Sequence, residues 1–517
     1  MTHLKKVILL IVTCFGIYQC SPLDDNKVPT QIEVQNFIWK GLNLYYLWQE
    51  EIPNLADNRF KNQFQLNTFL AKQSNPEQLF ENLLYKRGNV DRWSYLFNDY
   101  QELEQWLSGT SATTGMDFGL KYVSESSNKL FGFVRYVLPN SDAANKNVTR
   151  GTIFYSVNGV VLTDSNYSEL YKPTITLQLA DYNNGNITPN GKSITLTQTA
   201  YAENPIYLHK IITEGSQKVG YLMYNGFYNE YDLQLNDIFG TFKSSGVTDL
   251  VLDLRYNSGG SVQSAEYLAS MITGQFTGQL LLRQKWNAKL EKFITDDNPN
   301  ALVDNFPDKI NNTPINSLRF SKVYILTTKS SASASELVIN SLKPYINVIQ
   351  IGETTTGKNV GSVTLYDAID FSKEKSNKNH RYAMQPIVVK TVNNSAPQVG
   401  SNVTFTITVN PSAEVIQPTA LALCNGDSSN VINFNSLNSV GTTSYTWTNT
   451  NTSIGLGLNG AGALPSFTAI NTGTTPITAT ITVTPTYNGT SICNGTSKTF
   501  TITVNPSGQV NQPTNQV

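Results

Sequence analysis

Three serines, Ser331, Ser333 and Ser335, stand directly before the segment ELVINSLKPY, whose apolar spacing predicts an amphipathic helix. A serine at such a junction projects its hydroxyl from a turn, and the first N–H groups of the helix can stabilise an oxyanion. A serine hydroxyl becomes a good nucleophile only when a base removes its proton. Serines before a helix more commonly act as caps, so capping is the alternative for all three.

The base must come from elsewhere in the chain. Histidine is the usual base, but the sequence has only His3, His209 and His380. A lysine can replace histidine when burial keeps it neutral, because desolvation lowers the pKa of an ammonium group. Lys358 lies 25 residues after Ser333 in the sequence.

Lys358 also ends the stretch GETTTGK, residues 352–358, which fits most of a phosphate-binding loop. That motif needs Ser or Thr after the lysine to hold Mg²⁺, and this chain has Asn359. It also needs a helix that faces the phosphates, whereas NVGSVTLYDAIDF predicts a strand. The sequence therefore argues against Lys358 as a phosphate ligand.

Three motifs resemble the C-terminal processing (tail-specific) peptidases, which use a Ser–Lys dyad. Ser333-Ala334-Ser335-Glu336 is similar to their nucleophile motif, and Gly357-Lys358, at the family spacing, is similar to their base motif. VLDLRYNSGG, residues 251–260, resembles their DLRxNxGG strand and loop. The family usually has Gln four residues after the lysine, where this chain has Ser362, whose hydroxyl is able to accept a bond from Lys358.

The resemblance implies the role of each site residue. Ser333 would be the nucleophile and Lys358 the general base. Backbone N–H groups of Ala334 and of Gly259 or Gly260 would form the oxyanion hole. No metal or cofactor would be needed.

Residues 108–205 alternate short β-type runs with turn signals and resemble a PDZ domain. Gly119 and Leu120 stand where that family has its carboxylate-binding loop, and RGTIFYSVNG, residues 150–159, resembles its GDxIxxVNG strand and turn. Such a module would bind an extended peptide at a sheet edge and hold its terminal carboxylate. The alternative is a small β-rich domain that only packs on its neighbour.

The remaining segments complete a multidomain fold class. It combines an α/β peptidase core (ClpP/crotonase-like) with a helical N-terminal segment, a β-rich PDZ-like domain and an all-β C-terminal sandwich. The expected domains are a lipoprotein-type signal peptide (1–20), a tether (21–30), a helical domain (31–107), the PDZ-like domain (108–205), the Ser–Lys peptidase core (206–395) and a PKD-like module (400–517).

The C-terminal segment is poor in charge and rich in Thr, Asn, Gly and Pro. TFTITVNPS occurs at Thr404 and again at Thr499, 95 residues later, a spacing of about one domain. The segment resembles the PKD-like (immunoglobulin-like) repeats of secreted proteins, and a passive spacer is favoured over a ligand-binding module. If the chain is exported, a disulfide between Cys424 and Cys493 is permitted.

The N-terminus predicts export. The basic start MTHLKK precedes the apolar run VILLIVTCFGI, which is too short to span a bilayer as a helix and suits a signal peptide. Cys20 directly after this region predicts lipidation, although Tyr18 and Gln19 differ from the usual small residues, so cleavage without lipid stays open. The expected location is the cell envelope, on the periplasmic or the outer side, with a lipid anchor as the only attachment to a membrane.

The net charge of −1 gives no reason to expect nucleic acid or an anionic surface as a partner. The expected function is therefore an exported serine endopeptidase that cleaves polypeptides with a free, apolar C-terminus. Two alternatives stay open. One is an inactive peptide-binding lipoprotein, and the other is a surface adhesion protein that acts through residues 400–517.

Overall fold

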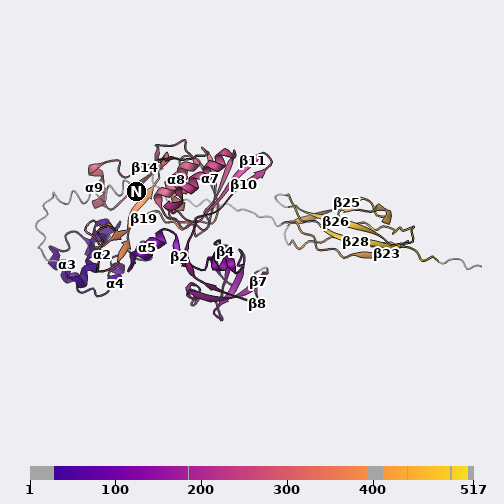
Figure 1. Cartoon of the computed structure of the whole chain (residues 1–517), viewed down its shortest axis with the longest axis horizontal. Helices are drawn as coiled ribbons and strands as arrows, with labels where there is room; N and C mark the ends of the chain where they lie inside the picture. The colour runs from indigo at the N-terminus through magenta and orange to yellow at the C-terminus, as the bar shows by residue number, and fades with distance from the viewer. Residues whose placement is uncertain (1–27, 184, 394–411, 439–440, 489–491, 510–517) are drawn as a thin grey trace, which may run out of the picture. The chain divides into compact units, whose positions relative to one another are not determined.

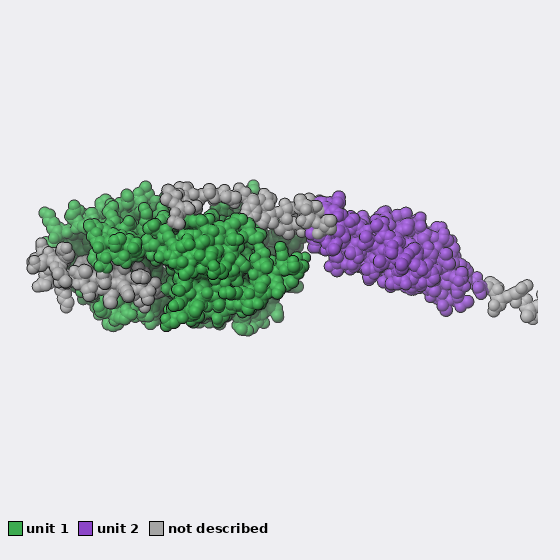
Figure 2. Space-filling model, turned by 90° about the horizontal axis from the view of Figure 1, so that it is seen from above, with its two compact units in different colours: residues 1–405 green, residues 406–517 purple. Residues whose placement is uncertain are grey.

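The computed structural model describes residues 28–183, 185–393, 412–438, 441–488 and 492–509. The chain divides into two compact units, residues 1–405 and residues 406–517, drawn in green and purple in Figure 2. All described residues that the sequence predicts for the site belong to the first unit.

Short capped helices open the first unit, drawn in indigo in Figure 1. Asn62, Asn75 and Asp99 each accept a hydrogen bond from a backbone N–H two or three residues further along, which starts α3, α4 and α5. The elements are η1 (Thr30–Ile32), α2 (Glu33–Tyr45), η2 (Gln49–Glu51), η3 (Pro53–Leu55), α3 (Gln63–Leu70), α4 (Pro76–Asn82), β1 (Tyr95–Phe97) and α5 (Tyr100–Leu107). β1 interrupts the predicted helical run because it pairs with β21 (Ala383–Gln385).

The N-terminal helices share their hydrophobic core with the end of the α/β segment. Phe37, Ile38 and Leu42 of α2 are buried in one cluster with Met384 and Val388. The expected helical domain and peptidase core are therefore joined by common packing, which can hold side chains of the helical segment against the α/β segment.

The β-rich segment forms an antiparallel sheet with the order β3-β4-β5-β7-β8, and β6 pairs with β5. Its elements are β2 (Thr110–Thr113), β3 (Met116–Tyr122), β4 (Leu130–Val137), α6 (Asp142–Asn145), β5 (Ile153–Val157), β6 (Val160–Val161), η4 (Tyr167–Tyr171), β7 (Thr174–Asn183), β8 (Asn186–Thr197) and β9 (Thr199–Ala202). β2 and β9 pair as a two-stranded ribbon where the chain enters and leaves this sheet.

A five-stranded sheet with the order β10-β11-β12-β17-β18 forms the centre of the first unit. β10 is antiparallel to β11, and the remaining pairs are parallel. The elements are β10 (Ile206–Glu214), β11 (Gln217–Tyr224), η5 (Asn229–Tyr231), α7 (Asp232–Ser244), β12 (Asp249–Asp253), α8 (Val262–Ile272), β17 (Lys322–Thr327), α10 (Ala334–Leu342) and β18 (Asn347–Gly352). The predicted strand and helix alternation is confirmed here, and α7 and α8 lie beside β10 and β11 in Figure 1.

A second sheet, with the order β14-β13-β22-β19, was not predicted from the sequence. Its strands come from distant parts of the chain, so no local sequence pattern predicts their pairing. The remaining elements are β13 (Leu280–Lys285), α9 (Ala288–Asp297), β14 (Val303–Asn305), β15 (Lys309–Ile310), β16 (Thr313–Pro314), β19 (Val360–Ser362), β20 (Leu365–Tyr366), β21 and β22 (Ile387–Val392).

The described part of the second unit is a six-stranded sheet with the order β23-β28-β26-β24-β25, and β27 pairs with β26. Its elements are β23 (Leu421–Cys424), β24 (Thr442–Asn449), η6 (Thr452–Ile454), β25 (Asn459–Ala461), β26 (Ile477–Asn488), β27 (Ile492–Asn494) and β28 (Lys498–Asn505). The first repeat copy, at Thr404, begins outside the described residues. Cys424 has a free thiol, so the permitted disulfide with Cys493 is not formed.

Candidate active site

Three loops that carry the predicted residues leave one edge of the central sheet. β12, β17 and β18 are neighbouring parallel strands. Residues 254–261 follow β12, residues 328–333 follow β17, and residues 353–359 follow β18. Because the carboxyl ends of parallel strands meet at the same edge, the fold brings the three motifs together.

Ser333 differs from the serines on either side of it. It is the N-cap of α10, with φ 56° and ψ −113°, a conformation that residues other than glycine rarely adopt. Ser331 Oγ donates to the carbonyl oxygen of Leu254 (2.7 Å), and Ser335 Oγ donates to that of Asn257 (3.0 Å). The two flanking hydroxyls therefore tie the β17 loop to the β12 loop.

Ser333 and Lys358 line the same cavity, of about 40 Å³. Burial lowers the pKa of Lys358 below its ordinary value, although the carboxylates of Glu336 and Asp91 act to raise it. The Nζ atom of Lys358 lies 5.9 Å from the ring centroid of Trp93. The other lining residues are Leu282, Glu336, Leu337, Asn340, Ser341, Asn359, Thr391, Val392 and Asn393.

Glu336 connects the nucleophile loop to the lysine loop. Its Oε2 atom accepts hydrogen bonds from the backbone N–H groups of Ser333 (2.9 Å) and Lys358 (2.8 Å). Its Oε1 atom accepts from Thr355 Oγ1 and the backbone N–H of Gly357, both at 2.6 Å. The sequence marks Glu336 as part of a motif and as a helix-start acid, but it does not reveal that one buried carboxylate joins both loops.

Gly259 lies against the start of α10. A Cβ atom at Gly259 would stand 2.7 Å from the Cβ of Ser333 and 3.0 Å from the backbone nitrogen of Ala334. The backbone N–H of Gly259 donates to the side-chain oxygen of Asn257 (2.8 Å). Gly259 is buried, whereas Gly260 is exposed and has a φ of 138°.

The helical segment contributes a side chain that the sequence did not single out. Asp91 is fully buried and accepts hydrogen bonds from the backbone N–H groups of Trp93 and Ser94 and from the hydroxyl of Tyr46. These bonds fix the turn that presents Trp93 to Lys358. Only long-range contacts show this role, because the motif-bearing segments lie more than 150 residues away.

Several predicted residues lie elsewhere. Ser362 is on β19, opposite Ile387, and is not one of the residues that line the cavity. Gly119 and Leu120 lie within β3, an edge strand, and pair with β4, so they are part of a strand and not of a loop. Cys20 and the predicted signal peptide lie outside the described residues.

The phosphate-loop alternative lacks its helix. β18 ends at Gly352, and the next element after Lys358 is the strand β19. The segment after Lys358 therefore does not begin a helix whose N-terminus could bind a phosphate at GETTTGK, as the sequence predicted.

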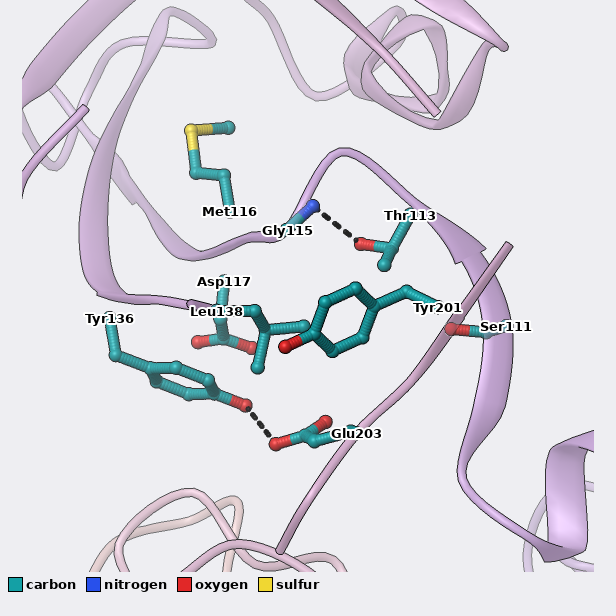
Figure 3. A pocket seen from close by; sticks show the side chains of 9 residues that line it. All are labelled: Ser111, Thr113, Gly115, Met116, Asp117, Tyr136, Leu138, Tyr201 and Glu203. Atoms are coloured by element: carbon teal, nitrogen blue, oxygen red, sulfur yellow. Dashed lines mark hydrogen bonds between the residues drawn. The ribbon is translucent and has the colours of Figure 1, made fainter. Parts of the chain in front are cut away.

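A larger cavity, of about 110 Å³, lies between the β-rich sheet and its β2–β9 ribbon (Figure 3). We call it the ribbon cavity; its lining residues are Ser111, Thr113, Gly115, Met116, Asp117, Tyr136, Leu138, Tyr201 and Glu203. Burial raises the pKa of both Asp117 and Glu203. Arg135 pairs with Asp117 and also reaches Ser330 Oγ (3.3 Å), so this region contacts the nucleophile loop.

The described residues contain no group of three or more His, Cys, Asp or Glu side chains that could hold a metal ion. None of their helices is both long and apolar enough to cross a membrane.

Two segments of the chain match models of one peptidase family. Residues 218–371 match the model of peptidase family S41, and residues 33–95 match that of the peptidase S41 N-terminal domain. These two segments are therefore similar to peptidase family S41. The S41 match contains Gly259, Ser333 and Lys358, and the S41 N-terminal match contains Trp93.

The curated proteins that the chain resembles are proteases by name. The "Probable CtpA-like serine protease" of Staphylococcus aureus (strain MRSA252) is 23% identical over 316 residues, 59% of this chain and 57% of that protein. The chloroplastic "Carboxyl-terminal-processing peptidase 2" of Arabidopsis thaliana is 24% identical over 261 residues, 48% of this chain and 47% of that protein. The chain thus spans about half the length of these curated relatives.

A solved structure also resembles the chain. A Bacteroides fragilis NCTC 9343 protein assigned to the S41 proteases is 26% identical, with a TM-score of 0.52, and the match covers 69% of this chain and 85% of that one. The S41 fold, with an N-terminal helical segment and a sheet-rich body, therefore accounts for most of the first unit.

Proposed function

We propose that the protein is a serine endopeptidase that uses Ser333 and Lys358 as a catalytic dyad. The observation that carries the proposal is that both residues line one cavity in which burial lowers the pKa of Lys358. A neutral lysine has the lone pair that a general base needs, and a base near neutrality works best at physiological pH.

The proposed reaction proceeds through an acyl-enzyme. Ser333 Oγ attacks the scissile carbonyl while the Nζ atom of neutral Lys358 takes the hydroxyl proton. Lys358 then gives this proton to the leaving amine, so the peptide C–N bond breaks and an ester on Ser333 remains. Water hydrolyses the ester with Lys358 again as base, which returns both residues to their starting state.

The oxyanion donors proposed are the backbone N–H groups of Ala334 and Gly260. Ala334 is the first residue of α10, where helix N–H groups lack intrahelical partners. Of the two candidate glycines, Gly259 already donates to Asn257, which favours the exposed Gly260. A hydrogen bond to the developing oxyanion is worth about 3 kcal/mol in related sites.

We further propose that the substrate is a polypeptide recognised by its free C-terminus through the PDZ-like segment. The edge position of β3, which contains Gly119 and Leu120, supports addition of an extended peptide there. The Arabidopsis relative, a carboxyl-terminal-processing peptidase by name, supports the same substrate class.

We propose export with lipidation at Cys20, since the N-terminal pattern of a basic start, an apolar run and a Cys supports it. Residues 400–517 would act as a PKD-like spacer. No metal or cofactor takes part in the proposed reaction.

Cleavage of an unfolded protein with an apolar C-terminus by residues 21–517 tests the proposal. We expect cleavage by the wild type and a loss of about 10⁴-fold or more in both Ser333→Ala and Lys358→Ala. Ser330→Ala is the matched control, because Ser330 is on the same loop but does not line the cavity, and it should keep most of the activity. Absence of cleavage over a broad substrate panel would favour a peptide-binding protein without catalysis. If deletion of residues 400–517 abolished biological function while sparing cleavage, the tail would be more than a spacer.

A further inference from the structure

Three aromatic side chains next to the candidate active site lie on the surface and contact one another. We call Tyr95, Phe97 and Trp106 the aromatic shelf. Tyr95 and Trp106 are 43% and 55% exposed. The ring centroids lie 6.4 Å apart for Tyr95 and Phe97, 6.4 Å for Tyr95 and Trp106, and 6.3 Å for Phe97 and Trp106.

β1 and α5 hold the aromatic shelf in place. Leu96, between Tyr95 and Phe97 on β1, packs against the core that the N-terminal helices share with the α/β segment. Because successive side chains of a strand point to opposite faces, Tyr95 and Phe97 point away from that core. α5, which carries Trp106, packs beside β1.

The shelf begins two residues after a side chain that lies near Lys358. Trp93, two residues before Tyr95, lies over the ammonium group of Lys358, and the buried carboxylate of Asp91 fixes its backbone. Four residues of chain span at most about 14 Å, so the backbone of Phe97 lies within about 14 Å of that of Trp93. That length corresponds to about four residues of an extended substrate.

We propose that the aromatic shelf binds apolar side chains of the polypeptide substrate as the chain runs toward Ser333. The occupant is an extended segment with aromatic or large aliphatic residues. Contact between such residues and the exposed rings removes the largest apolar area from water, which favours binding. This inference rests on the proposed peptidase function. It adds a sequence preference near the cleaved bond, which is separate from recognition of a C-terminus at β3.

Other exposed apolar residues lack this connection. Tyr167 and Tyr171 are 45% and 63% exposed, but they lie on η4 of the β-rich segment. Phe64, on α3, is 62% exposed and makes no part of the shelf. These residues provide matched controls with similar exposure.

The test measures binding without catalysis, in full-length Ser333→Ala protein. The probe is a fluorescein-labelled flexible peptide with Phe or Leu at alternating positions, and its counterpart carries Ser at those positions. We expect Trp106→Ala and Tyr95→Ala each to raise the Kd for the apolar peptide about tenfold. The Ser peptide should bind weakly to every variant, and Phe64→Ala should bind like its parent.

Two results would overturn the proposal. One is an unchanged Kd in both shelf variants that remain folded by circular dichroism. The other is a loss that follows Tyr171→Ala alone, which would assign binding to the β-rich segment. With Ser333 intact, the KM for the apolar peptide should rise with the Kd in Trp106→Ala. If shelf-dependent binding occurs and no variant cleaves the peptide, the proposed peptidase function fails while the shelf stands.

Discussion

The cavity that holds Ser333 and the ribbon cavity use buried charge differently. Burial shifts the pKa values of ionisable groups in both toward the neutral form: it lowers that of Lys358 and raises those of Asp117 and Glu203. In the first cavity, Glu336 accepts four hydrogen bonds between 2.6 and 2.9 Å. In the second, Glu203 accepts from Tyr136 and Asn225, both at 3.4 Å.

The difference teaches how to separate an organising carboxylate from a merely buried one. Short hydrogen bonds from several N–H donors hold the backbone in place and offset the free-energy cost of burying the carboxylate. Long hydrogen bonds offset little of that cost. The two cavities also differ in strain. The left-handed position in the ribbon cavity is Gly115, with φ 83°, while the other cavity places Ser333 in a conformation that favours glycine.

Among changes that test this contrast, the largest expected effect comes from Glu336→Gln. An amide has one acceptor oxygen, so at least two of the four bonds are lost, each worth about 1.5–3 kcal/mol when charged. We expect kcat/KM to fall about 10²-fold and the free energy of unfolding to fall by about 3 kcal/mol, measured by cleavage assays and denaturant titration. Glu353→Gln, an exposed change on the loop that carries Lys358, should cost about 0.5 kcal/mol or less. Equal losses in both variants would remove the contrast between the two kinds of carboxylate.

The next effect concerns the pH dependence of cleavage. The reaction needs neutral Lys358, so kcat/KM should rise with pH through the pKa of this lysine, which burial lowers. Trp93→Ala admits water to Lys358, which moves the pKa back toward its ordinary value. The profile should therefore shift to higher pH, and a shift of one unit means about tenfold less activity at neutral pH. Trp93→Phe should shift less, and an acid shift in Trp93→Ala would show that the ring acts mainly by attracting the ammonium group.

A smaller effect tests the strain at Ser333. Ser333→Gly and Ser333→Ala both remove the nucleophile, but only glycine relaxes a φ of 56°. The Gly variant should therefore be more stable than the Ala variant by about 1 kcal/mol in denaturant titration. Gly115→Ala should do the opposite and destabilise by at least about 1 kcal/mol, because the new Cβ would meet Ser141 at 2.0 Å. Equal stability of the two Ser333 variants would mean that the backbone carries no strain there.

The smallest effect is expected for Glu203→Gln. Burial raises the pKa of Glu203 in the folded state above its unfolded value. The ionised side chain therefore lowers the free energy of unfolding at high pH. This penalty shrinks as the pH falls through the folded pKa and is gone below the unfolded pKa. We expect Glu203→Gln to stabilise the protein at pH 8 by about 0.5 kcal/mol and to have less effect at pH 5. Thermal unfolding at the two pH values checks the sign. Destabilisation at pH 8 would class Glu203 with Glu336 as an organising carboxylate.

Local patterns were sufficient for the parts of the molecule that depend on local sequence. The strand and helix alternation from β11 to β18 follows from apolar periodicity. The sequence predicts that the helix before β12 ends at Gly246, and this glycine, with φ 69°, lies two residues after the end of α7. The motifs at 251–260, 333–336 and 357–358 follow parallel strands, so their meeting at one sheet edge could be anticipated.

The remaining features depend on contacts between distant segments. Nothing in the neighbourhood of Trp93 predicts that it lies over Lys358, and the sheet of β13, β14, β19 and β22 has no local signature. Gly119 and Leu120 were expected in a loop, but register with β4 places them within β3. The roles of Ser362 and Cys20 stay predictions from the sequence.

The shared carboxylate of Glu336 also determines how the site can be rebuilt after unfolding. The backbone N–H groups of Ser333 and Lys358 bind the same oxygen atom, so nucleophile and base become ordered in one event. In an unfolded chain, neither Ser333 nor Lys358 would be in its catalytic position until α10 packs against the rest of the fold. Recovery of activity during refolding should therefore follow a single kinetic phase, the one in which α10 forms its contacts.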